Sequence, residues 1–147
     1  MNILVSACLL GVGCRYNGEE KQDPRVAALL ARHTLIPVCP EQLGGLPTPR
    51  EPAERLDGRV LFRSGRDATE AFRRGAEQTL RLAELYGCRY AILKERSPSC
   101  GSGTIHDGGF AGGLVPGDGV AAALLKAHGV TVLGESELDR LPGERAD

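Results

Sequence analysis

Residues 67–94 read DATEAFRRGAEQTLRLAELYGCRYAILK, and this stretch decides the fold. From Asp67 to Tyr86 the apolar side chains recur at helical spacing, which predicts one long helix. Gly87 marks its end, because glycine readily adopts the left-handed conformation found just beyond helix C-termini. Residues 90–94 then form a short apolar run that is typical of a buried strand. A helix that leads directly into a buried strand is half of the crossover that joins parallel strands.

The same alternation continues on both sides of this stretch. Further strands are predicted at residues 3–6, 34–38 and 130–133, with a minor one at 59–62. Pro37 weakens the second of these predictions, because proline cannot donate a hydrogen bond to a sheet.

Three more helices are predicted. One opens at Asp23-Pro24, where aspartate suits the cap and proline the first helical position. The second covers residues 119–128 with Asp118 as its cap, and the third is a short helix at 135–140. The segments from Cys39 to about Pro52 and from Arg96 to about Gly117 are interpreted as loops rich in Gly, Pro or Ser, and 142–147 as a frayed tail.

This order of elements indicates an α/β protein. We expect residues 1–147 to form a single domain with a three-layer, Rossmann-like fold and a mainly parallel sheet. The length suits one domain, and a chain of this size can bury a sufficient core without disulfide bonds.

Composition excludes several classes of protein. The formal net charge is −1, which argues against a binder of polymeric nucleic acid. No apolar run is long enough for a membrane span. The first residues lack the basic flank and long apolar core of a signal peptide, so we expect a cytoplasmic protein. The oligomeric state is not predicted.

Three of the five cysteines follow the predicted strands almost immediately: Cys8, Cys39 and Cys100. The carboxyl ends of parallel strands open onto one edge of a sheet, where ligands bind in such folds. Neighbouring strands are about 4.8 Å apart, so the three thiols can converge within reach of a metal. Three thiolates suit either zinc with an open position or a cubane iron-sulfur cluster with one free iron. The alternative is three buried structural cysteines, and the absence of a Cys-x-x-Cys motif disfavours a zinc ribbon.

The other two cysteines have different expected places. Cys88 precedes a strand at the opposite edge of the sheet and is interpreted as structural. Cys14 lies in the first loop and could be a fourth ligand, a spare redox-active thiol or part of the pocket wall, which is the reading we favour.

The strand-end loops also carry groups that could move protons or bind an anion. Glu41 lies two residues after Cys39, where it could be a ligand, an anchor or a proton carrier, or simply an exposed loop residue. Ser97 belongs to the segment Ser97-Pro-Ser-Cys-Gly-Ser-Gly103, whose hydroxyls could donate to a cluster sulfur or an anion. His106 is a weaker candidate, whereas His33 and His128 fall near helix ends and are interpreted as structural. Four basic residues could meet a phosphate: Arg50, Arg66, Lys94 and Arg96.

Five motifs together resemble a known family. They are Val5-Ser-Ala-Cys-Leu-Leu-Gly11, Cys14-Arg-Tyr-Asn-Gly18, Pro37-Val-Cys-Pro-Glu-Gln-Leu-Gly-Gly-Leu-Pro-Thr-Pro-Arg50, Leu93-Lys-Glu-Arg-Ser-Pro-Ser-Cys-Gly-Ser-Gly103 and Gly117-Asp-Gly-Val120. They resemble the family catalogued as domain of unknown function 523, which includes the thiouracil desulfidases. The resemblance runs from residue 2 to about residue 134 and is to the short, single-domain form of the family.

The resemblance implies a bacterial cytoplasmic enzyme with a 4Fe-4S cluster on Cys8, Cys39 and Cys100. One iron would have no protein ligand and would take the substrate sulfur, while water replaces it in a non-redox hydrolysis to uracil and hydrogen sulfide. The catalytic pair of the family corresponds to Glu41, a proton shuttle, and Ser97, which assists substrate activation. The substrate would be thiouracil as the free base, a nucleoside or a nucleotide. The alternative function is a non-catalytic sulfur carrier or redox sensor that binds a cluster or a metal.

Overall fold

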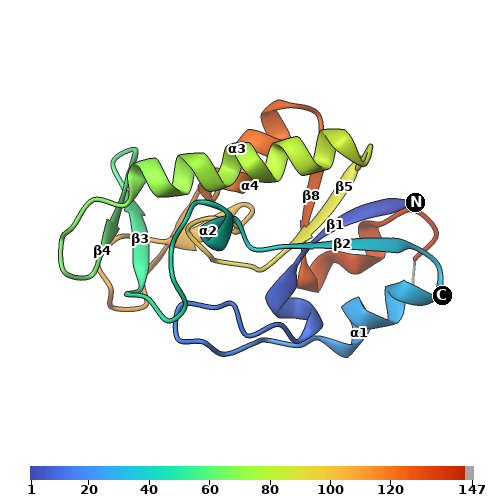
Figure 1. Cartoon of the computed structure of the whole chain (residues 1–147), viewed down its shortest axis with the longest axis horizontal. Helices are drawn as coiled ribbons and strands as arrows, with labels where there is room; N and C mark the ends of the chain where they lie inside the picture. Colours follow the sequence, from blue (N-terminus) through green and yellow to red (C-terminus); the bar gives the residue numbers. More distant parts are fainter. Residues whose placement is uncertain (145–147) are drawn as a thin grey trace.

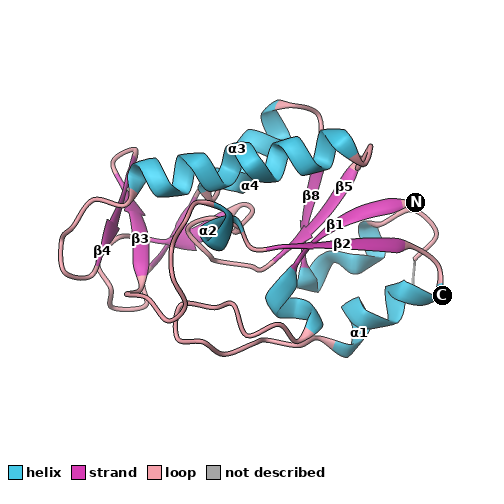
Figure 2. Cartoon of the chain, viewed as in Figure 1, coloured by secondary structure: helices cyan, strands magenta, loops and turns pink. Residues whose placement is uncertain are grey.

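A parallel four-stranded sheet forms the centre of the protein (Figures 1 and 2). The computed structural model describes residues 1–144, so residues 145–147 of the predicted tail lie outside the described residues. The sheet has the order β2-β1-β5-β8, with β1 at Asn2–Ser6, β2 at Thr34–Val38, β5 at Tyr90–Leu93 and β8 at Thr131–Gly134. The predicted α/β class with a parallel sheet is therefore confirmed. Pro37 is accommodated because β2 is an edge strand.

Helices cover both faces of this sheet. On one face lie α3 (Thr69–Leu85) and α4 (Val120–Ala127), whose apolar side chains pack with Leu4 of β1. On the other face Ile3 and Val5 pack with the segments that follow β1 and precede β2. Those segments are η1 (Ala7–Leu10), α1 (Pro24–Ala27) and η2 (Ala28–Ala31). The 3-10 helix η3 (Glu135–Arg140) packs on the same face through Leu138.

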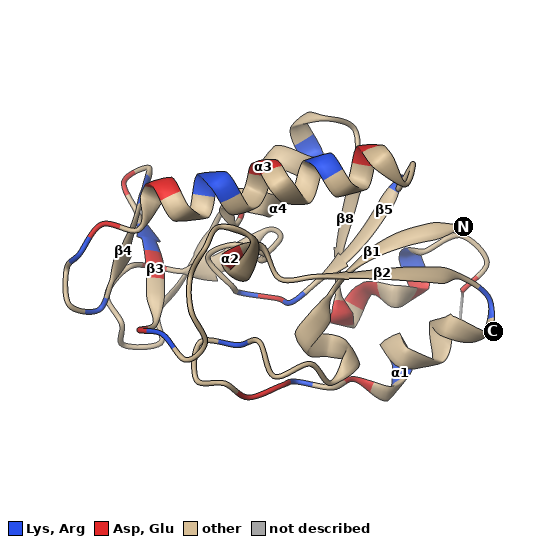
Figure 3. Cartoon of the chain, viewed as in Figure 1, with Lys and Arg blue, Asp and Glu red and all other residues tan. Residues whose placement is uncertain are grey.

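The long helix α3 carries charged residues along its length (Figure 3). Within residues 1–144 no helix is long and apolar enough to cross a membrane.

Two small antiparallel pairs lie beside the main sheet. β3 (Ala53–Leu56) pairs with β4 (Arg59–Phe62), and β6 (Thr104–His106) pairs with β7 (Leu114–Pro116). Only β4 was predicted. The other three strands have three or four residues and lie in or beside segments rich in glycine and proline, where periodicity carries little signal.

Helix α2 (Pro40–Leu43) was also missed, because the segment after Cys39 reads as a loop. The backbone of α2 packs directly against the backbone of α3. A Cβ on Gly75 of α3 would lie 1.8 Å from the carbonyl oxygen of Pro40, and one on Gly44 would lie 2.0 Å from the carbonyl oxygen of Ala71. These two glycines let the backbones meet, and the contact fixes α2 beside the carboxyl end of β2.

The predicted cap of α4 is wrong. Asp118 does not bond to the start of the helix; its carboxylate accepts from the backbone N–H of Gly103 and from Lys126. The first amides of the helix are instead satisfied by a distant loop, since Val120 donates to the carbonyl of Pro98 and Ala121 to that of Ser99. The start of α4 therefore holds the loop that carries Cys100. By contrast, the predicted cap Asp23 accepts from the N–H of Arg25, as expected.

We expect Gly75→Ala to destabilise the protein, although alanine normally stabilises a helix interior by about 1 kcal/mol relative to glycine. The new methyl group would collide with the backbone at Pro40 and force α2 outward, for a net loss of about 1–3 kcal/mol. Chemical denaturation measures this loss. Gln78→Ala, at an exposed position of the same helix, should change stability by less than about 0.5 kcal/mol. Equal stability of the two variants would contradict the role given to this contact.

Candidate active site

The carboxyl ends of three neighbouring strands meet at one edge of the sheet. Ser6 at the end of β1 is level with Val38 at the end of β2, and Val5 is level with Ile92 of β5. Each strand continues into a segment that carries a cysteine, so Cys8, Cys39 and Cys100 all reach this edge.

A cavity of about 430 Å³ opens there, a volume suited to a small organic ligand. Its walls include Cys8, Cys14, Cys39, Cys100, Glu41 and Ser97, so the structure brings the three expected cluster ligands and the expected catalytic pair to one cavity. Cys14 lines the cavity together with the three expected ligands. Cys88 does not line it and is buried instead in the core beneath α3 and α4.

Cys100 is buried beside Ser6, at the end of β1. The hydroxyl of Ser6 donates to its Sγ at 3.3 Å and also accepts from the backbone N–H of Lys94 at 2.9 Å, which ties β1, β5 and Cys100 together. Burial raises the pKa of the Cys100 thiol to about 12. In the metal-free protein this thiol therefore stays protonated at neutral pH.

Cys14 lies against two of the other thiols. The neighbouring thiol of Cys14, together with burial, raises the pKa of Cys39, whose Sγ donates to the carbonyl of Cys14 at 3.7 Å. For Cys14 the neighbouring thiol of Cys39 lowers the pKa, but the thiol of Cys8 and burial outweigh that effect and leave the pKa raised. All five cysteines are free thiols, and four of them form one group in the cavity wall.

The donor set of this cavity wall is rich in sulfur. Cys8, Cys14, Cys39 and Cys100 all line it. Within residues 1–144 no three His, Cys, Asp or Glu side chains are grouped so that they could hold a single metal ion. Soft thiolate donors fit an iron-sulfur cluster, whose irons take cysteine sulfur as ligands.

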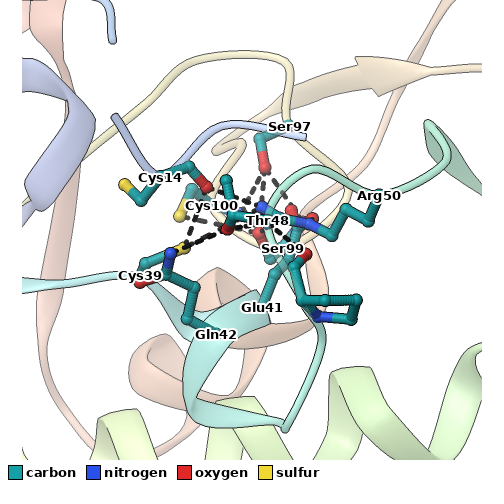
Figure 4. A network of polar contacts seen from close by, with 10 residues as sticks. Cys14, Cys39, Glu41, Gln42, Thr48, Arg50, Ser97, Ser99 and Cys100 are labelled. Carbon is teal, nitrogen blue, oxygen red and sulfur yellow. Dashed lines mark hydrogen bonds and ion pairs between the residues drawn. The ribbon is translucent and has the colours of Figure 1, made fainter. Parts of the chain in front are cut away.

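Glu41 projects from α2 into a polar network (Figure 4). Its Oε1 accepts from Nε of Arg50 at 2.9 Å, and its Oε2 accepts from the hydroxyl of Ser99 at 2.9 Å. The Arg50 side chain is only 4% exposed and also donates to the carbonyl of Cys14 and to the hydroxyl of Thr48. Glu41 is therefore held from two sides in a fixed orientation.

Ser97 is linked to Glu41 through Ser99. The two hydroxyl oxygens lie 3.0 Å apart, and Ser97 Oγ accepts from the backbone N–H groups of Ser99 and Cys100, both at 3.1 Å. A serine oxygen has two lone pairs and one hydrogen. With both lone pairs occupied, the hydroxyl hydrogen of Ser97 is available to Ser99 or to a ligand in the cavity.

Sequence reasoning singled out neither Ser6 nor Ser99, and it treated Arg50 only as a phosphate contact. The Ser97-Pro-Ser99 repeat of hydroxyls was the available signal for Ser99. For Arg50 there was none, because its partner depends on how residues 44–50 fold back over α2.

Of the other residues that the sequence suggested, some line the cavity and some lie elsewhere. Lys94, Arg96 and His106 line the cavity, and within the described chain the buried Nδ1 of His106 has no partner. Arg66 is instead paired with Glu51 at the surface. His33 bonds to Glu144, and His128 caps the C-terminus of α4, which fits their predicted structural roles.

A family model described as 2-thiouracil desulfurase matches residues 3–137. The chain belongs to the 2-thiouracil desulfurase family. A Bacillus subtilis (strain 168) relative, described as the uncharacterized protein YbbK, is 44% identical over 93% of this chain and 97% of its own length. A solved structure, described as the 4Fe-4S-dependent thiouracil desulfidase TudS, is similar with a TM-score of 0.90 and 48% identity. That match covers 95% of this chain and 94% of the other. The resemblance found in the motifs is thereby confirmed.

For this desulfurase-family chain we expect Arg50→Met to cost about 3 kcal/mol of stability, because it leaves the enclosed carboxylate of Glu41 without its cation. Arg66→Met is the matched control: it removes an exposed pair with Glu51 and should cost less than about 1 kcal/mol. Thermal and denaturant unfolding measure both. Similar losses of stability in the two variants would show that the enclosed Arg50–Glu41 pair contributes no more to stability than an exposed pair.

Proposed function

We propose that this protein is a 4Fe-4S-dependent desulfidase that hydrolyses thiouracil to uracil and hydrogen sulfide. The observation that carries the proposal is the meeting of three strand-end cysteines with a clamped carboxylate in one cavity. Family membership and the likeness to TudS support it. The free thiols fit a reducing compartment, which supports a cytoplasmic location.

Cys8, Cys39 and Cys100 would hold the cluster as thiolates. The raised pKa values of the Cys39 and Cys100 thiols mean that loading releases protons and is favoured by higher pH. When bound, the cluster supplies one iron without a protein ligand, a Lewis acid that prefers the sulfur of a thiocarbonyl to oxygen. Cys14 stays part of the wall.

The protein supplies the proton transfers. Glu41 takes a proton from the attacking water and returns it to the ring nitrogen or the departing sulfide. Arg50 and Ser99 keep its carboxylate in place for both steps. Ser97 directs its hydroxyl hydrogen to the substrate. Water contributes the new oxygen and the two hydrogens of hydrogen sulfide, so no electrons enter or leave.

The arginines that line the cavity help to decide whether the substrate is a free base or a nucleotide. Arg15, Arg63 and Arg96 line it, and within residues 1–144 none of the three is in a salt bridge. Guanidinium groups bind phosphate well. This arrangement supports a thiolated nucleotide as the preferred form over the free base.

The first experiment is anaerobic reconstitution, with iron and sulfide counted per chain and with 2-thiouracil and a thiolated uridine monophosphate assayed side by side. We expect about four irons and release of sulfide as the thiocarbonyl absorbance fades. Cys8→Ala, Cys39→Ala and Cys100→Ala should each lose the cluster, whereas Cys88→Ala, outside the cavity, should keep it. A wild type that takes up no iron would refute the mechanism.

The same iron count decides the role of Cys14. Cys14→Ala should retain the cluster, because the proposed site needs three thiolates. Its loss in that variant would indicate four protein ligands and would remove the open iron on which the reaction depends.

We expect Glu41→Gln to keep the cluster and lower kcat by at least about 100-fold, since an amide preserves the size of the side chain but cannot carry the proton. Ser97→Ala should also lower kcat. Glu51→Gln, which alters a carboxylate outside the cavity, is the control and should behave as wild type. Full activity in Glu41→Gln would argue instead for a cluster that carries sulfur without acid-base help.

A further inference from the structure

Phe110 lies in the turn between β6 and β7 and forms part of the cavity wall. The turn, residues 107–113, reads Asp-Gly-Gly-Phe-Ala-Gly-Gly. The backbone of Phe110 has a φ of +56°, in the left-handed region that bulky side chains rarely adopt. Such a conformation costs free energy and persists only where the surroundings impose it, and it is often found at ligand sites.

Glu54 of β3 imposes this conformation. Its Oε1 accepts from the backbone N–H of Gly108 at 2.9 Å and from that of Phe110 at 3.1 Å. Glu54 is only 9% exposed and makes no salt bridge within residues 1–144, so these amides are what offsets its burial. The turn is also packed tightly on β3, because a Cβ on Gly108 would lie 3.0 Å from the carbonyl oxygen of Arg55. Phe110 is therefore presented to the cavity by a rigid support.

A cation lies over one face of the Phe110 ring. Cζ of Arg63 lies 5.7 Å from the ring centroid, a cation–π distance, and Arg63 also lines the cavity. The ring and the cysteines thus belong to the walls of one cavity, which is large enough for a pyrimidine.

We propose that Phe110 is the stacking surface for the pyrimidine ring of the substrate and that Glu54 is the positioning residue that presents it. This proposal rests on the proposed function, because it requires a planar heteroaromatic ligand. Every such ring has a π-face that stacks on an aromatic side chain. Stacking holds the ring by its face and leaves its edge, which carries the thiocarbonyl group, free to meet the cysteines and Glu41.

The test compares Phe110→Ala, Phe110→Leu and Phe110→Tyr in the reconstituted enzyme. Affinity for the product uracil is measured by calorimetric titration, and kcat and KM are measured with 2-thiouracil. Phe110→Ala should weaken uracil binding and raise KM by about 10- to 100-fold, with a smaller change in kcat. Phe110→Tyr should restore both values, and Phe110→Leu, which has no π-face, should not.

Two further variants separate stacking from general damage. Glu54→Ala should raise KM in the same direction while Phe110 is still present, because the turn loses its anchor. Leu114→Ala alters an exposed residue of β7 outside the cavity wall and should leave uracil affinity and KM unchanged.

Each contrary result is decisive. Wild-type uracil affinity in Phe110→Ala, or full affinity in Phe110→Leu, overturns the stacking role, and so does a wild type that binds neither uracil nor uridine monophosphate. A wild type that binds uracil but releases no sulfide refutes the proposed function alone, and the titrations of the variants then still decide the role of Phe110.

Discussion

The backbone contact between α2 and α3 is the constraint on which the site depends. Cys39 directly follows the last residue of β2 and is the N-cap of α2. Helix α2 begins at Pro40, and Glu41 is its second residue. Because Gly75 lets the carbonyl of Pro40 lie against the long helix, one contact sets the positions of both a thiol and a carboxylate. A side chain at that point would displace Cys39 and Glu41, the proposed ligand and proton carrier, together.

The other helix of that layer fixes the opposite wall. The first amides of α4 donate to the carbonyls of Pro98 and Ser99, which closes the loop around Cys100. A helix N-terminus usually draws its partners from its own capping residue. Here the partners come from the loop that carries the site, so the stability of α4 and the shape of the cavity depend on each other.

The parts of the fold that could be predicted are those encoded by local patterns. The four strands and their parallel sheet follow from buried runs and a long amphipathic helix, and the meeting of Cys8, Cys39 and Cys100 follows from parallel topology alone. Arg50 and Asp118 show which contacts could not be predicted from local sequence patterns. Arg50 faces Glu41 only because of the path of a long loop, and Asp118 leaves its expected capping role because distant carbonyls satisfy the helix first. Interactions set by tertiary folding leave no periodic trace in the sequence.

The short turn from Ser97 to Cys100 joins the two kinds of chemistry in the cavity. Ser97 Oγ accepts from the N–H of Cys100, and the hydroxyl of Ser99 lies 2.9 Å from Glu41 and 3.7 Å from the sulfur of Cys100. The proposed proton carrier and a proposed cluster ligand are thus connected by one hydrogen-bonded unit. Catalysis by positioned groups is sensitive to shifts of about 1 Å. Because Ser97, Ser99 and Cys100 share a single turn, their mutual alignment is set locally, and only Glu41 must be brought to them by another element.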